Sequence, residues 1–175
     1  MPTTTVMPTT TNMPTTCRPL IGGLPGSWNS ACDVYTLSGD VYLDTNLDVT
    51  IDAFTDATFD GGGYTITYNG SNGDWTGLFK SSSYNGTFII QNINLRLGDI
   101  TTTTSTTTTS TPNLVDIADD SGGIITGNES SDFRNSKVEI YNCSVTCNYI
   151  NIDGGGIAGQ YFGQKSTSGC IISNC

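Results

Sequence analysis

The chain has 175 residues with 16 acidic side chains, 6 basic ones and no histidine, so its formal net charge is −10. This charge repels a phosphate backbone, and the composition therefore argues against nucleic acid as a partner. Only 13% of the residues are charged, and no apolar run reaches the ~18 to 20 residues of a membrane span. We expect a single domain on an extracellular surface, without a membrane span.

The first segment, residues 1–16, repeats Met-Pro-Thr-Thr without any apolar period. Proline fixes φ and removes a backbone donor, so the segment predicts an extended arm. Its Thr- and Pro-rich composition is typical of O-glycosylated stalks, and a disordered leader is the alternative.

The next segment, residues 17–34, is dense in glycine and proline between Cys17 and Cys32. We predict an N-terminal cap of turns around Leu24 and Trp28, closed by a Cys17–Cys32 disulfide. Repeat folds need such a cap because their terminal strands otherwise expose core residues and unpaired edges.

Strand patterns fill much of residues 35–175. Apolar and polar residues alternate strictly from Val41 to Ala53, which predicts one strand with an acidic outer side. Gly61–Gly63 predict a tight corner before the next strand begins at Tyr64. The Thr-rich run at 101–112 cannot supply a core face, so we predict a loop excursion that is open to O-glycosylation.

Three copies of one repeat can be aligned on Asn92, Asn142 and Asn174, and the last two copies are 32 residues apart. Apolar residues fall two apart on each side of the Asn, and the parity breaks at the Asn itself. This pattern predicts two buried strands joined by a sharp bend. Such a unit cannot bury its inner face alone, so copies must stack, with Ile90, Ile140 and Ile172 in one column. We therefore predict an all-β fold, a single-stranded parallel β-helix (β-solenoid).

The strings TFDGGGYTIT, IIQNINLRLG and GGGIAGQ followed by GCIISNC resemble right-handed β-helix repeats of large extracellular and virus- or cell-surface proteins. The resemblance covers about Tyr35–Cys175. It implies coils with an inward Asn at one corner and Gly-rich turns. It implies no single activity, because that fold hosts lyases, hydrolases, adhesins and inert fibres.

An even number of cysteines and four Asn-x-Ser/Thr sequons indicate an oxidising, secretory route. Cys143 and Cys175 share one column, so neighbouring strands would bring their Cα atoms to about 4.8 Å, within disulfide range. Buried free thiols are the alternative. The disulfide candidates are Cys17, Cys32, Cys143, Cys147, Cys170 and Cys175.

Three of the sequons, at Asn69, Asn85 and Asn128, lie in Gly- or Ser-rich turns, where we predict N-glycosylation. The fourth, at Asn142, lies in the inward Asn column. There a buried ladder of side-chain amides explains the residue better than a sugar does. The predicted ladder consists of Asn92, Asn142 and Asn174.

No catalytic, cofactor or metal site is predicted. The Gly-x-Gly-x-x-Gly match at 154–159 is not followed by a helix or by the acidic residue of a dinucleotide site. Histidine, the commonest general base, is absent, and no catalytic motif is recognisable. Asp119, Asp120 and Asp132 are the carboxylates available to a polysaccharide lyase or hydrolase, which is the least favoured function.

We predict a structural, glycosylated extracellular protein that stacks head-to-tail with copies of itself into a fibre or surface filament. Cys175 falls in the column of Cys143, and the strand matching Val145 and Cys147 does not follow it, so another copy would complete the open layer. The alternative is an adhesin or carbohydrate-binding surface module. Its stacking platforms would be Tyr64, Tyr68, Trp75 and Tyr84, although packing in the core or at a corner explains each of these residues better.

Overall fold

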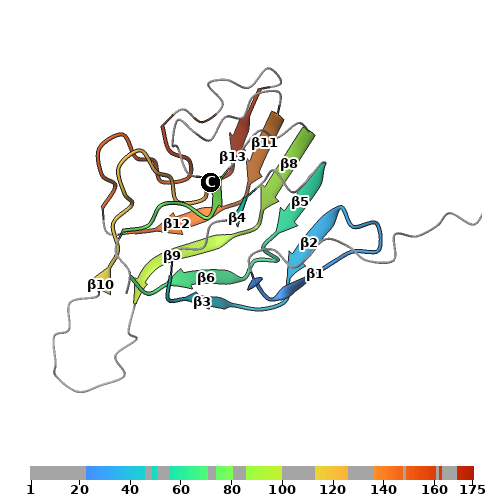
Figure 1. Cartoon of the computed structure of the whole chain (residues 1–175), viewed down its shortest axis with the longest axis horizontal. Coiled ribbons are helices and arrows are strands. Elements are labelled where there is room, and N and C mark those ends of the chain that lie inside the picture. The colour runs from blue at the N-terminus through green and yellow to red at the C-terminus, as the bar shows by residue number, and fades with distance from the viewer. Residues whose placement is uncertain are drawn as a thin grey trace, which may run out of the picture.

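The computed structural model of the chain describes residues 23–45, 49–50, 56–70, 74–80, 86–99, 113–125, 136–147, 149–160, 162 and 169–175. Within these ranges the chain forms strands and no α-helix (Figure 1). The strands are β1 (Gly26–Trp28), β2 (Val34–Leu37), β3 (Val41–Leu43), β4 (Val49–Thr50), β5 (Ala57–Asp60), β6 (Thr65–Tyr68), β7 (Phe79–Lys80), β8 (Gly86–Gln91), β9 (Asn94–Asp99), β10 (Asn113–Leu114), β11 (Ser136–Tyr141), β12 (Ser144–Thr146) and β13 (Ile171–Ser173).

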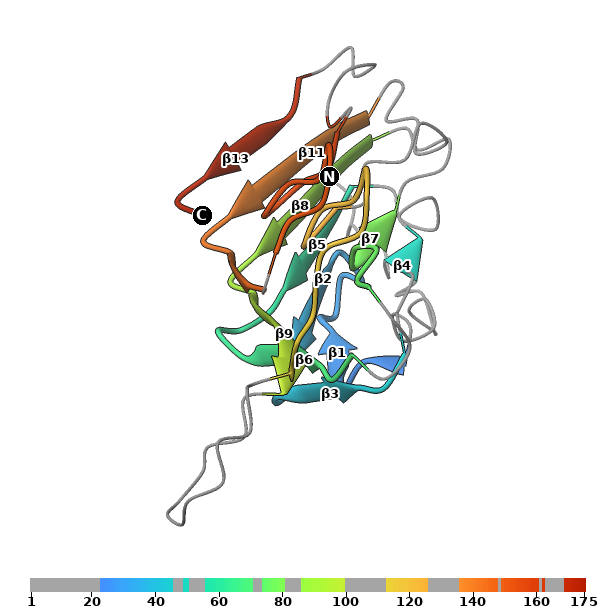
Figure 2. The same cartoon turned by 90° about the vertical axis from the view of Figure 1, so that its left-hand side faces the viewer.

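The strands form three sheets. The first has the order β1-β2-β5-β8-β11-β13, and every pair from β2 onward is parallel. Figure 2 shows these strands side by side, with β13 at one edge. The second sheet has the order β10-β9-β6-β3, with β12 also paired to β9, and the third consists of β4 and β7. Four chain segments, β2–β3, β5–β6, β8–β9 and β11–β12, each pass from the first sheet to the second, and we call each segment a layer.

Sharp bends join the two strands of each layer. Asn92 and Asn142 adopt left-handed backbone with φ of 56° and 51°, a conformation that asparagine tolerates better than most residues. Gly62 and Gly63 adopt positive φ at the equivalent bend between β5 and β6. The parity break in the sequence and the glycine corner are therefore both confirmed as bends.

The column register inferred from the repeats is also confirmed. Ile140 pairs with Ile90 on one side and with Ile172 on the other, and Leu95 pairs with Val145. Ile90 and Ile140 are fully buried. Equivalent side chains therefore pack on one another from layer to layer, because a period-two pattern in parallel strands keeps one face inward.

The predicted single-stranded parallel β-helix is nevertheless wrong. The sheets are mixed, since β1 runs antiparallel to β2 and β10 runs antiparallel to β9. Each layer continues beyond the second sheet, and we call these continuing segments the third side. Within the described ranges the third side holds only the two-residue strands β4 and β7 and isolated bridges such as Ile117 to Ile150. Glycines crowd that side at 122–123 and 154–156, and glycine weakens strands. The strand content agrees with the all-β part of the prediction.

The alternating segment that begins at Val41 does not form one strand. The chain bends at Asp44 and Thr45, so that β3 pairs with β6 in the second sheet while β4 pairs with β7 in the third. Residues 46–48 and 51–53 lie outside the described ranges. Strict alternation indicated extended backbone correctly, but it did not reveal the change of sheet.

At the N-terminal side of the described residues, β1 and β2 form a hairpin at the edge of the first sheet. Leu24 is buried, and its carbonyl accepts a hydrogen bond of 2.5 Å from the Tyr35 hydroxyl. Cys32 is disulfide-bonded, while its expected partner Cys17 lies outside the described residues. The predicted arm at 1–16 and the predicted Thr-rich loop at 101–112 also lie outside them.

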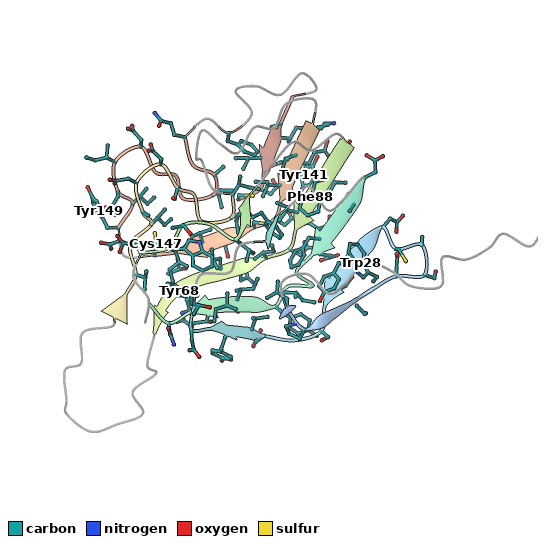
Figure 3. All side chains as sticks on the ribbon, in the orientation of Figure 1. Trp28, Tyr68, Phe88, Tyr141, Cys147 and Tyr149 are labelled. Atoms are coloured by element: carbon teal, nitrogen blue, oxygen red, sulfur yellow. The ribbon has the colours of Figure 1, made fainter. Side chains whose placement is uncertain are left out.

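The core contains a continuous row of aromatic side chains among its aliphatic residues. Phe59 lies 5.8 Å from Tyr35 and 5.1 Å from Phe79, measured between ring centroids, and Phe79 lies 5.6 Å from Phe88. All four rings are fully buried. Figure 3 shows the labelled Phe88 among these interior side chains. Since each ring contacts the ring of another strand, the layers share one core.

Candidate functional site

Large apolar side chains are exposed mainly at one end of the molecule. Among the described residues seven are exposed, and two of them, Tyr42 and Tyr64, are remote from this end in the sequence. Tyr149 extends from the periphery of the ribbon in Figure 3. The remaining members belong to the last described segments, and we call this group the C-terminal end face: Tyr149, Ile150, Ile152, Ile171 and Ile172.

The end face is exposed because no described layer covers it. Ile172 belongs to the same column as Ile90 and Ile140, yet it is 44% exposed whereas they are fully buried. Ile150 is 38% exposed, whereas Ile117, its bridge partner one layer below, is fully buried. These side chains therefore occupy core positions without a core on their outer side.

The edge of the first sheet is open at the same place. β13 pairs with β11, and no other described strand pairs with β13. An unpaired edge presents a row of backbone N–H and C=O groups, which proteins usually protect with charged residues or proline. Residues 169–175 contain neither, and residues 149–160 contain a single charged side chain, Asp153. The segments that form the end face thus carry one charged side chain, on a chain of net charge −10.

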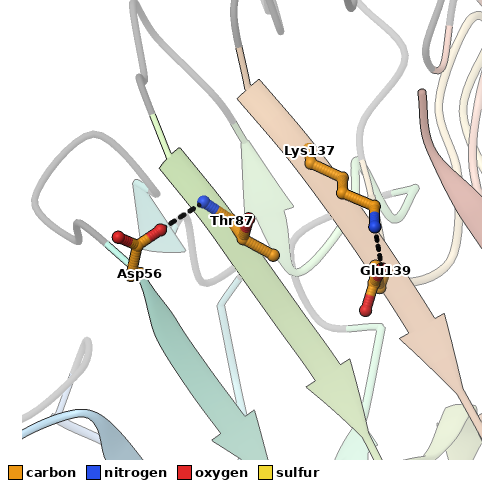
Figure 4. Close-up of polar contacts among 4 residues, drawn as sticks. All are labelled: Asp56, Thr87, Lys137 and Glu139. Atoms are coloured by element: carbon orange, nitrogen blue, oxygen red, sulfur yellow. Dashed lines mark hydrogen bonds and ion pairs between the residues drawn. The ribbon is translucent and has the colours of Figure 1, made fainter. Parts of the chain in front are cut away.

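The two charged residues of β11, the strand that pairs with β13, compensate each other. Glu139 on β11 is the register partner of Ile171, and its carboxylate lies 2.5 Å from the Lys137 ammonium (Figure 4). The hydrogen bond from Lys137 lowers the pKa of Glu139. Elsewhere on the outer face of this sheet, the Asp56 carboxylate accepts a 2.8 Å hydrogen bond from the Thr87 backbone (Figure 4). No uncompensated charge of β11 therefore opposes the approach of another molecule to β13.

The Asn side chains of the column form a row of hydrogen bonds at the bend, but they do not point into the core. Asn142 donates from Nδ2 to Oδ1 of Asn92 at 3.3 Å, and Asn92 donates from Nδ2 to Oδ1 of Asp60 at 3.0 Å. Asn142 is exposed and Asn92 is half-buried, because the left-handed bend turns these side chains away from the core. Asn174 has the same left-handed backbone and is exposed. The expectation of a buried ladder is therefore wrong, although two of its members are hydrogen-bonded.

Asp60 is the last acceptor in this row of hydrogen bonds, and it accepts two more. Its carboxylate receives the Gly62 backbone N–H at 2.8 Å and the Gln91 side-chain amide at 2.9 Å. Partial burial alone would raise the pKa of Asp60, but the hydrogen bonds from Asn92, Gly62 and Gln91 outweigh burial and hold the pKa below its ordinary value.

We expect Asp60→Asn to destabilise the chain by about 1 to 2 kcal/mol at neutral pH, because a charged acceptor of three hydrogen bonds is lost. The stabilisation by Asp60 is complete above the unfolded pKa of about 3.9 and is lost as the pH falls through the lower folded pKa. Urea unfolding at several pH values measures both effects. The exposed Asp119→Asn variant serves as control and should follow the wild type, whereas parallel curves for Asp60→Asn would contradict the role of this carboxylate.

Only two of the four sequons fall within the described residues. Asn69 is half-buried, and its Nδ2, the atom that would carry a glycan, donates to the Asp44 carboxylate. Asn142 uses the same atom to contact Asn92. A glycan at either position would displace a hydrogen bond between layers. Asn85 and Asn128 lie outside the described ranges.

The four C-terminal cysteines, Cys143, Cys147, Cys170 and Cys175, are free thiols. The Cys143–Cys175 disulfide is thus not formed, but the two residues are adjacent, because the Cys143 backbone N–H donates to Sγ of Cys175 at 3.4 Å. Burial raises the pKa of Cys143 to about 11. Burial also raises the pKa of Cys147.

Two of the four aromatic platforms expected for an adhesin belong to the core. Tyr68 and Trp75 are fully buried, and Trp75 donates from its indole N–H to the Gly123 carbonyl at 2.8 Å. Tyr64 is 39% exposed, and Tyr84 lies outside the described ranges. The carbohydrate-binding interpretation therefore loses two of its four stacking platforms.

A shallow groove of about 320 Å³ on the second sheet is lined by Thr65, Asn94, Leu95, Arg96, Ser144 and Thr146, without an aromatic ring.

The glycine motif at 154–159 forms a corner of the stack. Gly122 bridges Gly155, and Ile125 bridges Ala158, so the motif lies directly against its counterpart in the preceding repeat. Of the carboxylates considered for catalysis, Asp119 and Asp120 are exposed, and Asp132 lies outside the described ranges.

Comparisons with protein families, curated proteins and solved structures found no match to this chain. Among the described residues, no helix combines the length and apolar character needed to cross a bilayer. The C-terminal end face is therefore the strongest basis for a function. Tyr149, Ile150 and Ile152 belong to no recognisable motif. The only sequence feature that could have identified them as site residues is their position in the last repeat.

Proposed function

We propose that the chain is a structural surface protein that associates with copies of itself through the C-terminal end face. The exposure of Ile172 supports this proposal most directly, because its column partners are fully buried. Full burial of an exposed isoleucine stabilises by roughly 1.5 to 3 kcal/mol. Ile150, Ile152 and Ile172 are 38%, 76% and 44% exposed, so covering them contributes the corresponding part of that energy. The open edge of β13 adds backbone hydrogen bonds to any strand laid against it.

The association we propose is head-to-tail. At the opposite end of the molecule, β1 is the outer strand of the first sheet and β3 is the outer strand of the second. A second copy could place these two strands against β13 and β12 of the first copy. Such a contact joins two different surfaces, so it repeats without closing and produces a filament.

We place this assembly outside the cell. The disulfide at Cys32 and the low share of charged residues support an oxidising, extracellular setting. Covalent N-glycans at Asn69, Asn85 and Asn128 are part of the same proposal, and the extracellular setting supports them. A glycan at Asn69 would replace its hydrogen bond to Asp44.

The variant Ile172→Lys tests the proposal. A lysine in the exposed core column would have to be buried without a partner in the assembly, so we expect association to weaken at least about tenfold, equivalent to about 1.4 kcal/mol. Light scattering across a concentration series gives the mass, and electron microscopy shows whether filaments form. The matched control is Tyr64→Lys, which introduces the same charge at an exposed aromatic outside the end face.

Each outcome bears on the proposal. A wild-type mass that rises with concentration, with Tyr64→Lys unchanged and Ile172→Lys reduced, supports it. A wild-type chain that stays monomeric throughout the series would exclude it. A mass that stops at the dimer would replace the head-to-tail contact by a two-fold pairing of end faces.

A further inference from the structure

We propose that Cys143 and Cys175 form a redox pair whose disulfide fastens the edge strand β13 to β11. The proposal does not depend on self-association. It rests on the positions of the two residues in neighbouring repeats and on the contacts between them.

The two cysteines occupy equivalent places. Tyr141 and Ser173 are register partners in β11 and β13, and each is followed by a left-handed Asn and then by the cysteine. Neighbouring parallel strands lie about 4.8 Å apart, and a disulfide tolerates Cα separations of roughly 4.4 to 6.8 Å. The equivalent places of the two cysteines in neighbouring layers therefore suit a disulfide.

The contacts between the residues agree with this placement. The Cys143 backbone N–H donates to Sγ of Cys175 at 3.4 Å, and the neighbouring Cys175 thiol contributes to the raised pKa of Cys143. Each thiol currently donates to a carbonyl two residues earlier, Cys143 to Tyr141 at 3.3 Å and Cys175 to Ser173 at 3.2 Å. Rotation of the two side chains away from these carbonyls brings the sulfurs together.

The different exposure of the two thiols sets the order of steps. Cys175 is exposed, so its thiolate attacks one sulfur of a small-molecule disulfide such as oxidised glutathione and releases one glutathione thiolate. Cys143 is buried and attacks Sγ of Cys175 as a thiolate, releasing the second glutathione. The two cysteines lose two protons and two electrons in total, and the two glutathione molecules leave as thiols.

The second step is slow at neutral pH. Burial raises the pKa of Cys143 to about 11, so only a small fraction of this thiol is ionised. We therefore expect the rate of ring closure to rise about tenfold for each pH unit between pH 7 and pH 9, because the thiolate fraction rises by that factor. A pH-independent rate would mean that Cys143 is not the resolving thiol.

The disulfide would change the end face. β13 has three residues and pairs with a single strand among the described ones, so its attachment to the stack is weak. Linking Cys143 to Cys175 closes a loop of 32 residues and removes conformations from the unfolded chain. We expect the melting temperature of the oxidised chain to exceed that of the reduced chain by about 5 to 15 °C.

The experiment uses the full chain carrying Cys147→Ser and Cys170→Ser, treated with oxidised glutathione. Trypsin cleaves after Lys137 and Lys165, so Cys143 and Cys175 fall in separate peptides, 138–165 and 166–175. We expect a reduction-sensitive link between these peptides, loss of both free thiols and the rise in melting temperature. Cys175→Ser is the matched control and should show none of the three.

Thiols that stay reduced after prolonged treatment would overturn the proposal, and so would a link that joins two chains instead of one. If the double variant does not fold, Cys147→Ser alone decides the question, because fragment ions of the linked peptides distinguish Cys170 from Cys175. A link through Cys170 would assign the redox pair differently and would equally reject the proposal.

Discussion

Trp75→Ala should destabilise the chain by about 3 to 5 kcal/mol, because removing a fully buried indole leaves a large cavity. The ring lies 5.0 Å from that of Tyr68, measured between centroids, and its N–H donates to the Gly123 carbonyl at 2.8 Å. Its backbone also accepts from Ala118 at 2.9 Å, so this residue joins the second sheet to the glycine-rich third side. Urea unfolding followed by circular dichroism measures the loss.

Two matched variants separate the contributions. Trp75→Phe keeps an aromatic ring but leaves the buried Gly123 carbonyl without its indole donor, and we expect a smaller loss of about 1 to 3 kcal/mol. Tyr42→Ala removes an aromatic ring that is 80% exposed and should change the unfolding free energy by less than about 0.5 kcal/mol. Equal effects for Trp75→Ala and Tyr42→Ala would contradict the core position of Trp75.

Gly122→Ala should cost about 3 kcal/mol or more. A methyl group at this position would overlap the backbone oxygen of Ile125 and the backbone nitrogen of Gly159. Backbone atoms cannot move aside as a flexible side chain does, and here they belong to the stacked corner in which Gly122 bridges Gly155. Thermal unfolding should therefore show a clearly lower midpoint than that of the wild type.

Gly39→Ala is the control for this substitution. Gly39 has no atom within 4 Å of the position of an added methyl group, and its φ is outside the left-handed region. We expect no loss of stability, and a gain of up to about 1 kcal/mol, because alanine restricts the unfolded chain. A similar loss for both variants would show that the close approach at Gly122 is not the cause.

The register of the layers could be predicted from the sequence because side-chain alternation in a strand has a period of two. Ile90, Ile140 and Ile172 stand two residues before an Asn in each repeat, and parallel pairing keeps such positions together. The prediction that the layers close into a β-helix was wrong, because the period-two pattern does not extend to the third side. That side depends on glycine-rich segments, whose path is set by tertiary contacts, and the reversal at β1 depends on a turn that leaves no periodic signal.

The candidate site was predictable in part. The column pattern places Ile172 at the last layer, and its exposure follows from that position. The direction of the Asn side chains was predicted wrongly, because a left-handed residue interrupts the alternation and resets which face is inward. The burial of Tyr68 and Trp75 agrees with the expectation that core packing explains these aromatic residues better than ligand stacking does. The contact that holds Trp75 there, with Gly123 48 residues away, could not be predicted from local alternation.

The hairpin of β1 on β2 forms one edge of the first sheet, and β13 forms the opposite edge within the described residues. Because each strand of the first sheet uses the preceding one as a template for its backbone hydrogen bonds, folding can proceed from this hairpin toward the C-terminus while the chain is being synthesised. Substitutions that disrupt the β1–β2 hairpin should then disturb the formation of every later strand, whereas substitutions that disrupt β13 should have only a local effect. We therefore expect the strands of the first sheet to form in order from β1 to β13.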